Sequence, residues 1–252
     1  MRGSMKNLYR KEFALDANDI DFETKLSIPA IMRHFQAAAS NHAKEMGMDY
    51  FALKAKSDAF WVITKVKIKI YGYPQWSEKV VLKTWPLLPS AIKCNRDFEI
   101  LNARKETVVA GTSEWCILDM ASRRPRKVST TCYPIKMKHL RKQALSERFS
   151  HFPADFENQE FVYERKIRST DMDLNHHTNN TIYSLIAFDS FSVADLEKME
   201  ILGYEIHFCS ETKEGELLRV SHRELDGKVL ITGINGDSGR LIFQAAVEYK
   251  TR

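Results

Sequence analysis

The chain has 252 residues, of which 44% are hydrophobic and 28% are charged, and its formal net charge is +5. This composition is ordinary for a globular protein, and the length allows one large domain or two small ones, each with a core of its own. No apolar stretch approaches the roughly 20 residues that a membrane-spanning helix needs, so we expect no membrane span.

The ends and the cysteines give expectations about processing and location. The opening MRGSM resembles a leader left by cloning, so Met5 is the expected natural start and residues 1–4 are set aside. The residues after Met5 do not have the pattern of a signal or transit peptide, because acidic residues appear from Glu12 onwards. The cysteines have no paired spacing, which indicates neither a zinc site nor a disulfide framework. A reducing cytoplasm fits best. The cysteines are Cys94, Cys116, Cys132 and Cys209.

The first half begins with a predicted helix over residues 28–46. Ser27 is a suitable N-cap, Pro29 is tolerated in the first turn, and Gly47 ends the helix. Four β-strands are then predicted. Residues 64–70 alternate apolar side chains with lysines, and residues 79–85, 93–101 and 107–119 are β-rich runs separated by turn residues. The helix has a broad apolar stripe. Its members are Ile28, Ile31, Met32, Phe35, Ala38, Ala39 and Met46.

The second half repeats this order. An offset of 154 residues places YRKEFALDANDID (9–21) on YERKIRSTDMDLN (163–175), and it places Ile28 on Ile182, where a second apolar helix is predicted. Strand-like segments follow again at residues 204–211, 216–224, 228–234 and 240–250. We interpret the chain as a duplicated α+β unit. The expected parts are an N-terminal unit (5–140), a connector (141–160) and a C-terminal unit (161–252).

One apolar helix followed by an antiparallel meander suggests a sheet wrapped around that helix. Two such units in one chain would make a tandem (double) hotdog fold. Periodicity alone leaves a different α+β packing open.

The segment DMDLNHHTNN (171–180) is too polar for a core. Treated as an extended strand, it places alternate side chains on one face. That face would hold Asp171, Asp173, Asn175, His177 and Asn179. Asn179 or Asn180 could then cap a helix that begins near Thr181, where backbone N–H groups favour developing negative charge.

An imidazole, an amide and a carboxylate in one row suit the hydrolysis of a thioester, which needs an activated water and donors for the oxyanion. The alternative for Asp171 and Asn179 is that they only form turns and caps. A metal site is disfavoured, because His176 and His177 would point to opposite faces of a strand. At the offset of 154, Asp21 and Glu23 align with Asn175 and His177, so the first half lacks the imidazole.

The sequence at this point resembles the acyl-acyl carrier protein (acyl-ACP) thioesterases, the plant and bacterial enzymes that release fatty acids from the carrier. The family pattern D-x-D-x-N-x-H-x-N-N-x-x-Y is met in full by residues 171–183. NHAKEMG (41–47), FWVITKVKIKI (60–70), YPQW (73–76), TW (84–85) and SEWCILD…RRPRK (113–127) also look like family landmarks. The resemblance implies a tandem hotdog fold, no cofactor, and a catalytic C-terminal half.

The family also implies a glutamate on the strand after the second helix, and Glu211 matches it. Plant members carry a cysteine directly after this glutamate, whereas this chain has Thr212, so a cysteine nucleophile at that position is excluded. Cys209 is expected to be a small buried residue rather than a nucleophile.

The mechanistic hypothesis is therefore based on carboxylates. Glu211 would activate a water, or alternatively attack directly. Asn175 and His177 would position the water or polarise the carbonyl. Asp173 would orient Asn175 or the helix-end amides, which would hold the oxyanion, with Asp171, Asn179 and Asn180 in support.

Two further regions acquire roles from the resemblance. The run 123–142 contains eight basic residues and no acid, and it is either a solvated loop or a docking surface for the acidic carrier protein. The proposed docking residues are Arg123, Arg124, Arg126 and Lys127. The acyl chain would lie along Met32, Phe35, Ala38 and Ala39 of the first helix, for which the alternative is plain core packing.

The expected partner is thus acyl carrier protein bearing a fatty acyl chain, and hydrolysis would end fatty acid synthesis. A homodimer is compatible with the sequence, and nothing in it indicates nucleic-acid binding. Two alternatives stay open. One is an acyl-CoA thioesterase or hydratase on the same fold, against which the duplication and the complete motif argue. The other is a non-enzymatic acyl-binding protein.

Overall fold

The computed structural model describes residues 7–152, 159–225 and 227–252. The chain divides into two compact units, one formed by Met1–Val66 with Tyr71–Arg148 and the other by Lys67–Ile70 with Phe149–Arg252. The expected leader, the start at Met5 and part of the expected connector lie outside the described residues. Within the described ranges, the helices are too short or too polar to cross a membrane.

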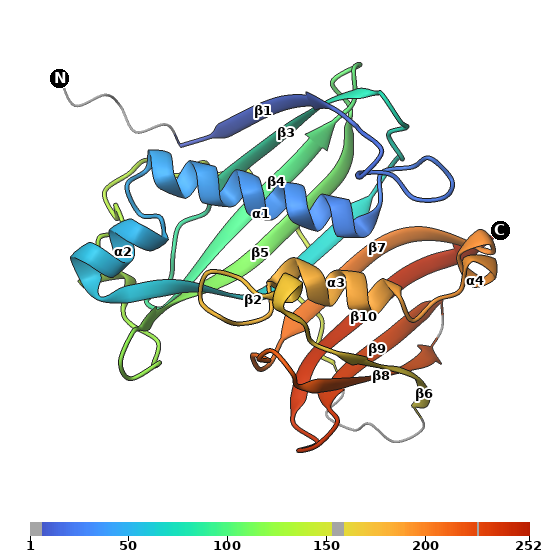
Figure 1. Cartoon of the computed structure of the whole chain (residues 1–252). Helices are drawn as coiled ribbons and strands as arrows, with labels where there is room; N and C mark the ends of the chain where they lie inside the picture. Colours follow the sequence, from blue (N-terminus) through green and yellow to red (C-terminus); the bar gives the residue numbers. More distant parts are fainter. Residues whose placement is uncertain (1–6, 153–158, 226) are drawn as a thin grey trace. The chain divides into compact units, whose positions relative to one another are not determined.

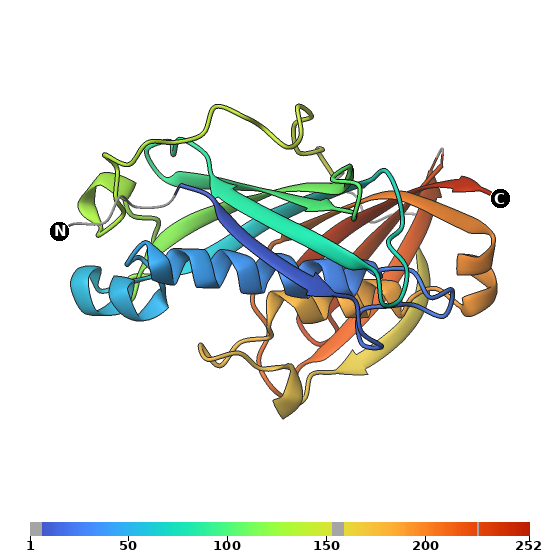
Figure 2. The same cartoon turned by 90° about the horizontal axis from the view of Figure 1, so that it is seen from above.

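The first unit is an antiparallel sheet with one long helix on it (Figure 1). The strands follow the order β1-β3-β4-β5-β2 across the sheet. Figure 2 shows α1 lying along one face of these strands. The elements are β1 (Tyr9–Ala14), α1 (Ile28–Glu45), α2 (Tyr50–Ser57), β2 (Ala59–Ile70), β3 (Lys79–Pro86), β4 (Lys93–Leu101) and β5 (Thr107–Asp119).

Helix α1 forms where the sequence predicts it. The Ser27 hydroxyl accepts a hydrogen bond from the Ala30 N–H, and Gly47 follows the helix with φ +66°, a conformation that suits glycine. The apolar stripe faces the sheet, and the ring of Phe35 stacks on that of Phe98 in β4 with centroids 4.2 Å apart. Burial of this stripe fixes the helix on the sheet.

The second unit repeats the plan. Its strands follow the order β7-β10-β9-β8-β6, and α3 packs on one face, with the Tyr183 ring 5.9 Å from that of Phe208 and 5.7 Å from that of Phe243. The elements are β6 (Glu160–Lys166), α3 (Asn180–Phe188), α4 (Val193–Glu197), β7 (Met199–Phe208), β8 (Leu217–Leu225), β9 (Lys228–Asn235) and β10 (Leu241–Thr251).

Most predicted strands are confirmed to within two residues, and the differences have local causes. Strand β2 begins at Ala59 rather than at residue 64, and its first residues AFWVI lack the alternation on which the prediction was based. Helices α2 and α4 were not predicted, since they are short and α2 buries a single residue, Leu53. Strand β7 ends at Phe208, before the residues expected to complete it.

A buried carboxylate ties the start of the second unit to its sheet. The side chain of Glu205 in β7 accepts hydrogen bonds from the N–H of Ser150 (2.7 Å), the hydroxyl of Ser150 (2.9 Å) and Nε2 of His207 (2.8 Å). The ammonium of Lys67 lies 3.4 Å away. Burial alone would raise the pKa of Glu205, but the hydrogen bonds from His207 and Ser150 and the charge of Lys67 together lower it below its ordinary value of 4.5.

Replacing Glu205 by glutamine is therefore expected to lower the free energy of unfolding at neutral pH by about 1–3 kcal/mol. A carboxyl group with a lowered pKa stabilises the fold above its unfolded-state pKa, and this contribution is lost as the pH falls through the folded-state value. The difference between wild type and Glu205→Gln should thus shrink below about pH 4.5. Urea unfolding from pH 7 to pH 3 measures this, with the exposed Glu160→Gln as control. A difference that does not depend on pH would contradict it.

Candidate active site

The polar segment 171–180 is a tight loop, and the prediction that it is extended is wrong. Met172 and Thr178 form an antiparallel bridge, and the Asp173 N–H donates to the His177 carbonyl at 2.8 Å. His176 turns the chain with φ +59°. One oxygen of Asp173 accepts the N–H groups of Asn175 (2.7 Å) and His177 (3.3 Å). A short carboxylate bonding to nearby backbone favours such a turn over a strand.

The two residues at the edges of the motif have structural contacts. Asp171 is buried, and its oxygens accept from the Arg165 guanidinium (2.6 Å) and the Arg168 N–H (2.9 Å). Asn179 is the N-cap of α3 and accepts the N–H of Thr181, while Asn180 is the first residue of that helix. The prediction that Asn179 or Asn180 caps this helix is thus confirmed for Asn179, and the cap occupies the Thr181 amide.

The loop brings His177 to Glu211. Nε2 of His177 lies 3.2 Å from Oε2 of Glu211, and the two side chains have relative exposures of 17% and 40%. At this exposure the Glu211 side chain is accessible to water. Within the described residues, the side-chain amide of Asn175 forms no hydrogen bond, so it is available to a substrate.

Glu211 lies in the loop after β7, not on the strand as predicted. The N–H groups of Cys209 and Ser210 both bond to the carbonyl of Ile242, which ends the β7–β10 ladder before Glu211. Cys209 is exposed, so the prediction that it is buried is also wrong. Leaving the ladder frees the Glu211 carboxylate to turn toward His177.

A buried network of hydroxyl groups lies beside this pair, and the sequence interpretation missed it. The Thr212 hydroxyl is 2.7 Å from that of Thr178 and 2.8 Å from that of Tyr183, and the Thr212 N–H donates to the Tyr183 oxygen at 3.2 Å. Burial, with a smaller effect of the Glu211 charge, raises the pKa of Tyr183, against hydrogen bonds that lower it. The phenol therefore stays protonated at neutral pH. The motif contained Tyr183, but Thr212 was noted only as not being cysteine.

The first unit contains the same loop. One oxygen of Asp21 accepts the N–H groups of Glu23 (2.9 Å) and Lys25 (3.0 Å), and the Asp21 N–H donates to the Lys25 carbonyl at 2.8 Å. Thr24 turns the chain with φ +62°, as His176 does in the second unit. Asp21 therefore corresponds to Asp173, an offset of 152 residues.

The alignment at an offset of 154 residues is thus wrong by two. The structure pairs Glu23 with Asn175 and Lys25 with His177. The ammonium of Lys25 is 2.8 Å from the Glu23 carboxylate and 5.4 Å from the centroid of the Tyr73 ring. The first unit has the same loop with a lysine at the position of the imidazole. The conclusion that the first half lacks this imidazole therefore still holds.

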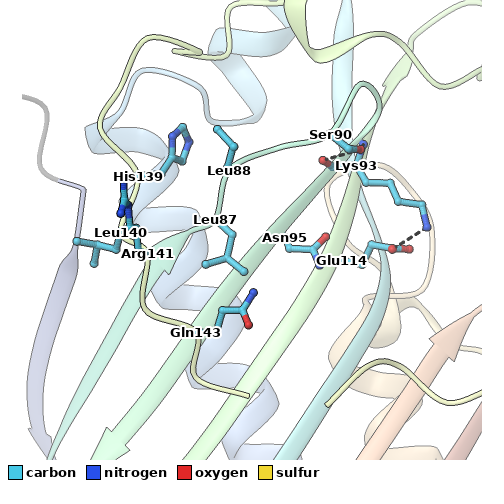
Figure 3. A pocket seen from close by; sticks show the side chains of 10 residues that line it. All are labelled: Leu87, Leu88, Ser90, Lys93, Asn95, Glu114, His139, Leu140, Arg141 and Gln143. Atoms are coloured by element: carbon cyan, nitrogen blue, oxygen red, sulfur yellow. Dashed lines mark hydrogen bonds and ion pairs between the residues drawn. The ribbon is translucent and has the colours of Figure 1, made fainter. Parts of the chain in front are cut away.

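The residues proposed to line the acyl chain are buried in α1. Met32, Phe35, Ala38 and Ala39 are each at most 5% exposed. A pocket of about 650 Å³ in the first unit lies elsewhere (Figure 3). Seven of the ten residues that line it are polar or charged, with an ion pair of 2.8 Å between Lys93 and Glu114, and it contains none of the four. Such a lining is not typical of a site for a hydrocarbon chain. The acyl site along α1 stays a prediction.

The proposed docking residues lie in the loop after β5. Arg123, Arg124 and Lys127 are exposed, and the Arg123 guanidinium lies 4.9 Å from the centroid of the Phe60 ring. Arg126 is different, because it donates to the Ser57 carbonyl and lies 3.8 Å from the Asp119 carboxylate. Arg126 holds the loop in shape, and the other three present charge to solvent.

Known proteins match over nearly the whole chain. An acyl-ACP hydrolase (FATB3) of Cuphea viscosissima is 23% identical over 228 residues, which cover 83% of this chain and 53% of that protein. The chain thus spans about half the length of that relative. Two solved structures have the same fold, each with a TM-score of 0.88. One is an acyl-ACP thioesterase from Bacteroides thetaiotaomicron (18% identity, 97% of this chain and 98% of that one). The other is a 12:0-ACP thioesterase from Umbellularia californica (21% identity, 98% of each chain).

These structures confirm the predicted tandem hotdog fold. Two family models also match, that of the acyl-ACP thioesterase N-terminal domain over residues 6–135 and that of the C-terminal domain over residues 155–251. The chain therefore belongs to the acyl-ACP thioesterase family.

Proposed function

We propose that this protein hydrolyses the thioester between a fatty acyl chain and acyl carrier protein, releasing the free fatty acid and so ending fatty acid synthesis. The observation that carries the proposal is the pair of His177 and Glu211, 3.2 Å apart and partly exposed, with the Asn175 amide on the same loop. A carboxylate held by an imidazole is a suitable general base.

In the proposed reaction, Glu211 accepts a proton from a water molecule, whose oxygen attacks the carbonyl carbon of the thioester. His177 holds the Glu211 carboxylate, and Asn175 donates to the carbonyl oxygen as it gains negative charge. Asp173 fixes Asn175 and His177 through their backbone N–H groups. When the C–S bond breaks, the proton on Glu211 passes to the thiolate of the carrier, which restores the carboxylate.

The test is to incubate the protein with acyl-ACP of graded chain length and to identify free fatty acids by mass spectrometry. The proposal expects release, and faster release from acyl-ACP than from acyl-CoA carrying the same acyl group. Faster release from acyl-CoA would favour the acyl-CoA thioesterase alternative. Tight acyl binding without release would favour a non-enzymatic acyl-binding protein.

The other expectations belong to this proposal. The acyl chain would lie along Met32, Phe35, Ala38 and Ala39, which belong to the buried apolar stripe of α1, in the unit that lacks the imidazole. A location in the cytoplasm stays a prediction, made from the unpaired spacing of the cysteines in the sequence, and within the described residues the structure forms no disulfide. A homodimer stays a prediction that the molar mass in solution would check.

The exposed basic loop is the proposed docking surface for the carrier protein, which is strongly acidic. Reversing the charges of Arg123, Arg124 and Lys127 to glutamate is expected to raise KM for acyl-ACP by roughly tenfold at low salt and to flatten the dependence of KM on salt. The turnover number should change little, because these residues lie outside the proposed catalytic loop.

The matched control reverses Lys79, Arg104 and Lys105, three exposed basic residues at other positions of the first unit. Both variants change the net charge by the same amount. A difference in KM between them therefore reports on the location of the reversed charges. If KM depends on salt concentration equally in the two variants, residues 123–127 form a solvated loop and not a docking surface.

A further inference from the structure

We propose that the hydroxyl groups of Thr178, Thr212 and Tyr183 form a positioning network that holds Glu211 against His177. The inference rests on the proposed function, which it deepens. Both threonines are adjacent in sequence to the reacting pair, because Thr178 directly follows His177 and Thr212 directly follows Glu211. Fixing Thr178 to Thr212 therefore fixes the backbone from which both functional side chains extend.

The contacts are buried and specific. Thr212 is 0% exposed, Tyr183 2% and Thr178 4%, so no solvent competes for their hydrogen bonds. The Thr178 N–H donates to the Thr212 carbonyl at 3.0 Å, and the Thr178 hydroxyl is 3.4 Å from that carbonyl. Glu211, one residue away, stays 40% exposed. The network thus anchors the backbone of an otherwise irregular loop and leaves the carboxylate accessible.

One arrangement of hydrogens satisfies all three hydroxyl groups. The Tyr183 oxygen accepts the Thr212 N–H, and its own proton goes to the Thr212 oxygen. The Thr212 proton goes to the Thr178 oxygen, and the Thr178 proton to the Thr212 carbonyl. The position of Thr212 is therefore determined from two sides, by α3 through Tyr183 and by the catalytic loop through Thr178.

The first unit shows that the fold does not require these hydroxyl groups. That unit has Leu26 in its loop and Ile31 in α1 at the positions of Thr178 and Tyr183, and both are 1% exposed. The Leu26 N–H donates to the Pro74 carbonyl at 3.0 Å, as the Thr178 N–H does to Thr212. Pro74 thus corresponds to Thr212. The same loop and the same backbone hydrogen bond exist in the first unit with apolar residues at all three positions, Leu26, Ile31 and Pro74. The hydroxyl groups occur in the unit that has the His177–Glu211 pair.

The test is Thr212→Val, which removes the hydroxyl group and keeps the side-chain volume. Because a misplacement of about 1 Å in an active site costs up to about 10²-fold, we expect kcat on acyl-ACP to fall 10–100-fold with KM within about twofold. Thr212→Ser, which keeps the hydroxyl group, should restore kcat to within about threefold of wild type. In a Glu211→Gln background, Thr212→Val should cause no further loss.

The matched control is Thr232→Val, which removes another buried threonine hydroxyl of the same unit, one that accepts from Gln159 at 3.0 Å. Its kcat should equal that of wild type. A folded Thr212→Val with wild-type kcat would overturn the inference, and so would a loss that adds to that of Glu211→Gln.

A second measurement separates this inference from the proposed function. Crystal structures of wild type, Thr212→Val and Thr212→Ser give the distance from His177 Nε2 to Glu211 Oε2 without any turnover. We expect hydrogen-bonding distance in wild type and Thr212→Ser, and a separation outside it in Thr212→Val. If wild type releases no fatty acid, the proposed function is wrong. The distance between His177 Nε2 and Glu211 Oε2 then still tests whether the hydroxyl network positions this pair. An unchanged distance in Thr212→Val overturns it.

Discussion

Glu211→Gln is expected to lower kcat for fatty acid release from acyl-ACP by about 10²–10⁴-fold, the usual contribution of a general base. Glutamine has the same size and can still meet His177 at 3.2 Å, but it cannot take a proton from water. KM should change little, since no binding surface is removed. Steady-state release of fatty acid, followed by mass spectrometry, measures the loss.

The control for this variant is Glu214→Gln, in which an exposed carboxylate of the same loop is neutralised. Its kcat should match wild type. Should Glu211→Gln fold normally and still turn over at the wild-type rate, Glu211 is not the base and the proposed reaction is wrong.

His177→Ala is expected to have the second largest effect, a fall in kcat of about 10²-fold or more. The imidazole is the group that holds the Glu211 carboxylate, so its loss leaves the base misplaced. For residues that act as one unit the effects do not add. The double variant with Glu211→Gln should therefore be little slower than Glu211→Gln alone.

The neighbouring imidazole provides the control. His176 is exposed and has φ +59°, a conformation that asparagine tolerates, so His176→Asn should keep both the loop and the activity. A double variant whose loss equals the product of the single losses would mean that His177 and Glu211 act independently, which contradicts the proposed reaction.

The sequence predicted the scaffold well because local signals and burial agree there. Ser27, Pro29 and Gly47 mark the ends of α1, and strands β3, β4 and β5 are β-rich runs separated by turn residues. The family motif contains Asp173, Asn175 and His177, which lie on one loop, and the structure places His177 3.2 Å from Glu211. The shape of that site was not predictable from alternation, because the Asp173 carboxylate bonds to the backbone of its own loop and overrides the strand pattern.

The alignment of the two halves was also not predictable from residue types alone. Aligning by residue type gave an offset of 154, whereas the hydrogen bonds of Asp21 and Asp173 show that the offset is 152. Few side chains are shared between the two loops, so residue identity carries little information there. The contact between Thr212 and Tyr183 joins residues 29 positions apart, and no spacing rule indicates it.

The most direct test of the central claim is a single turnover in water labelled with ¹⁸O, with enzyme in excess over acyl-ACP. If Glu211 activates water, the released fatty acid carries one ¹⁸O and the peptide that contains Glu211 carries none. Unlabelled fatty acid together with ¹⁸O in the Glu211 peptide would contradict the proposed role of Glu211 as a base, because it would show that the carboxylate itself attacks the thioester.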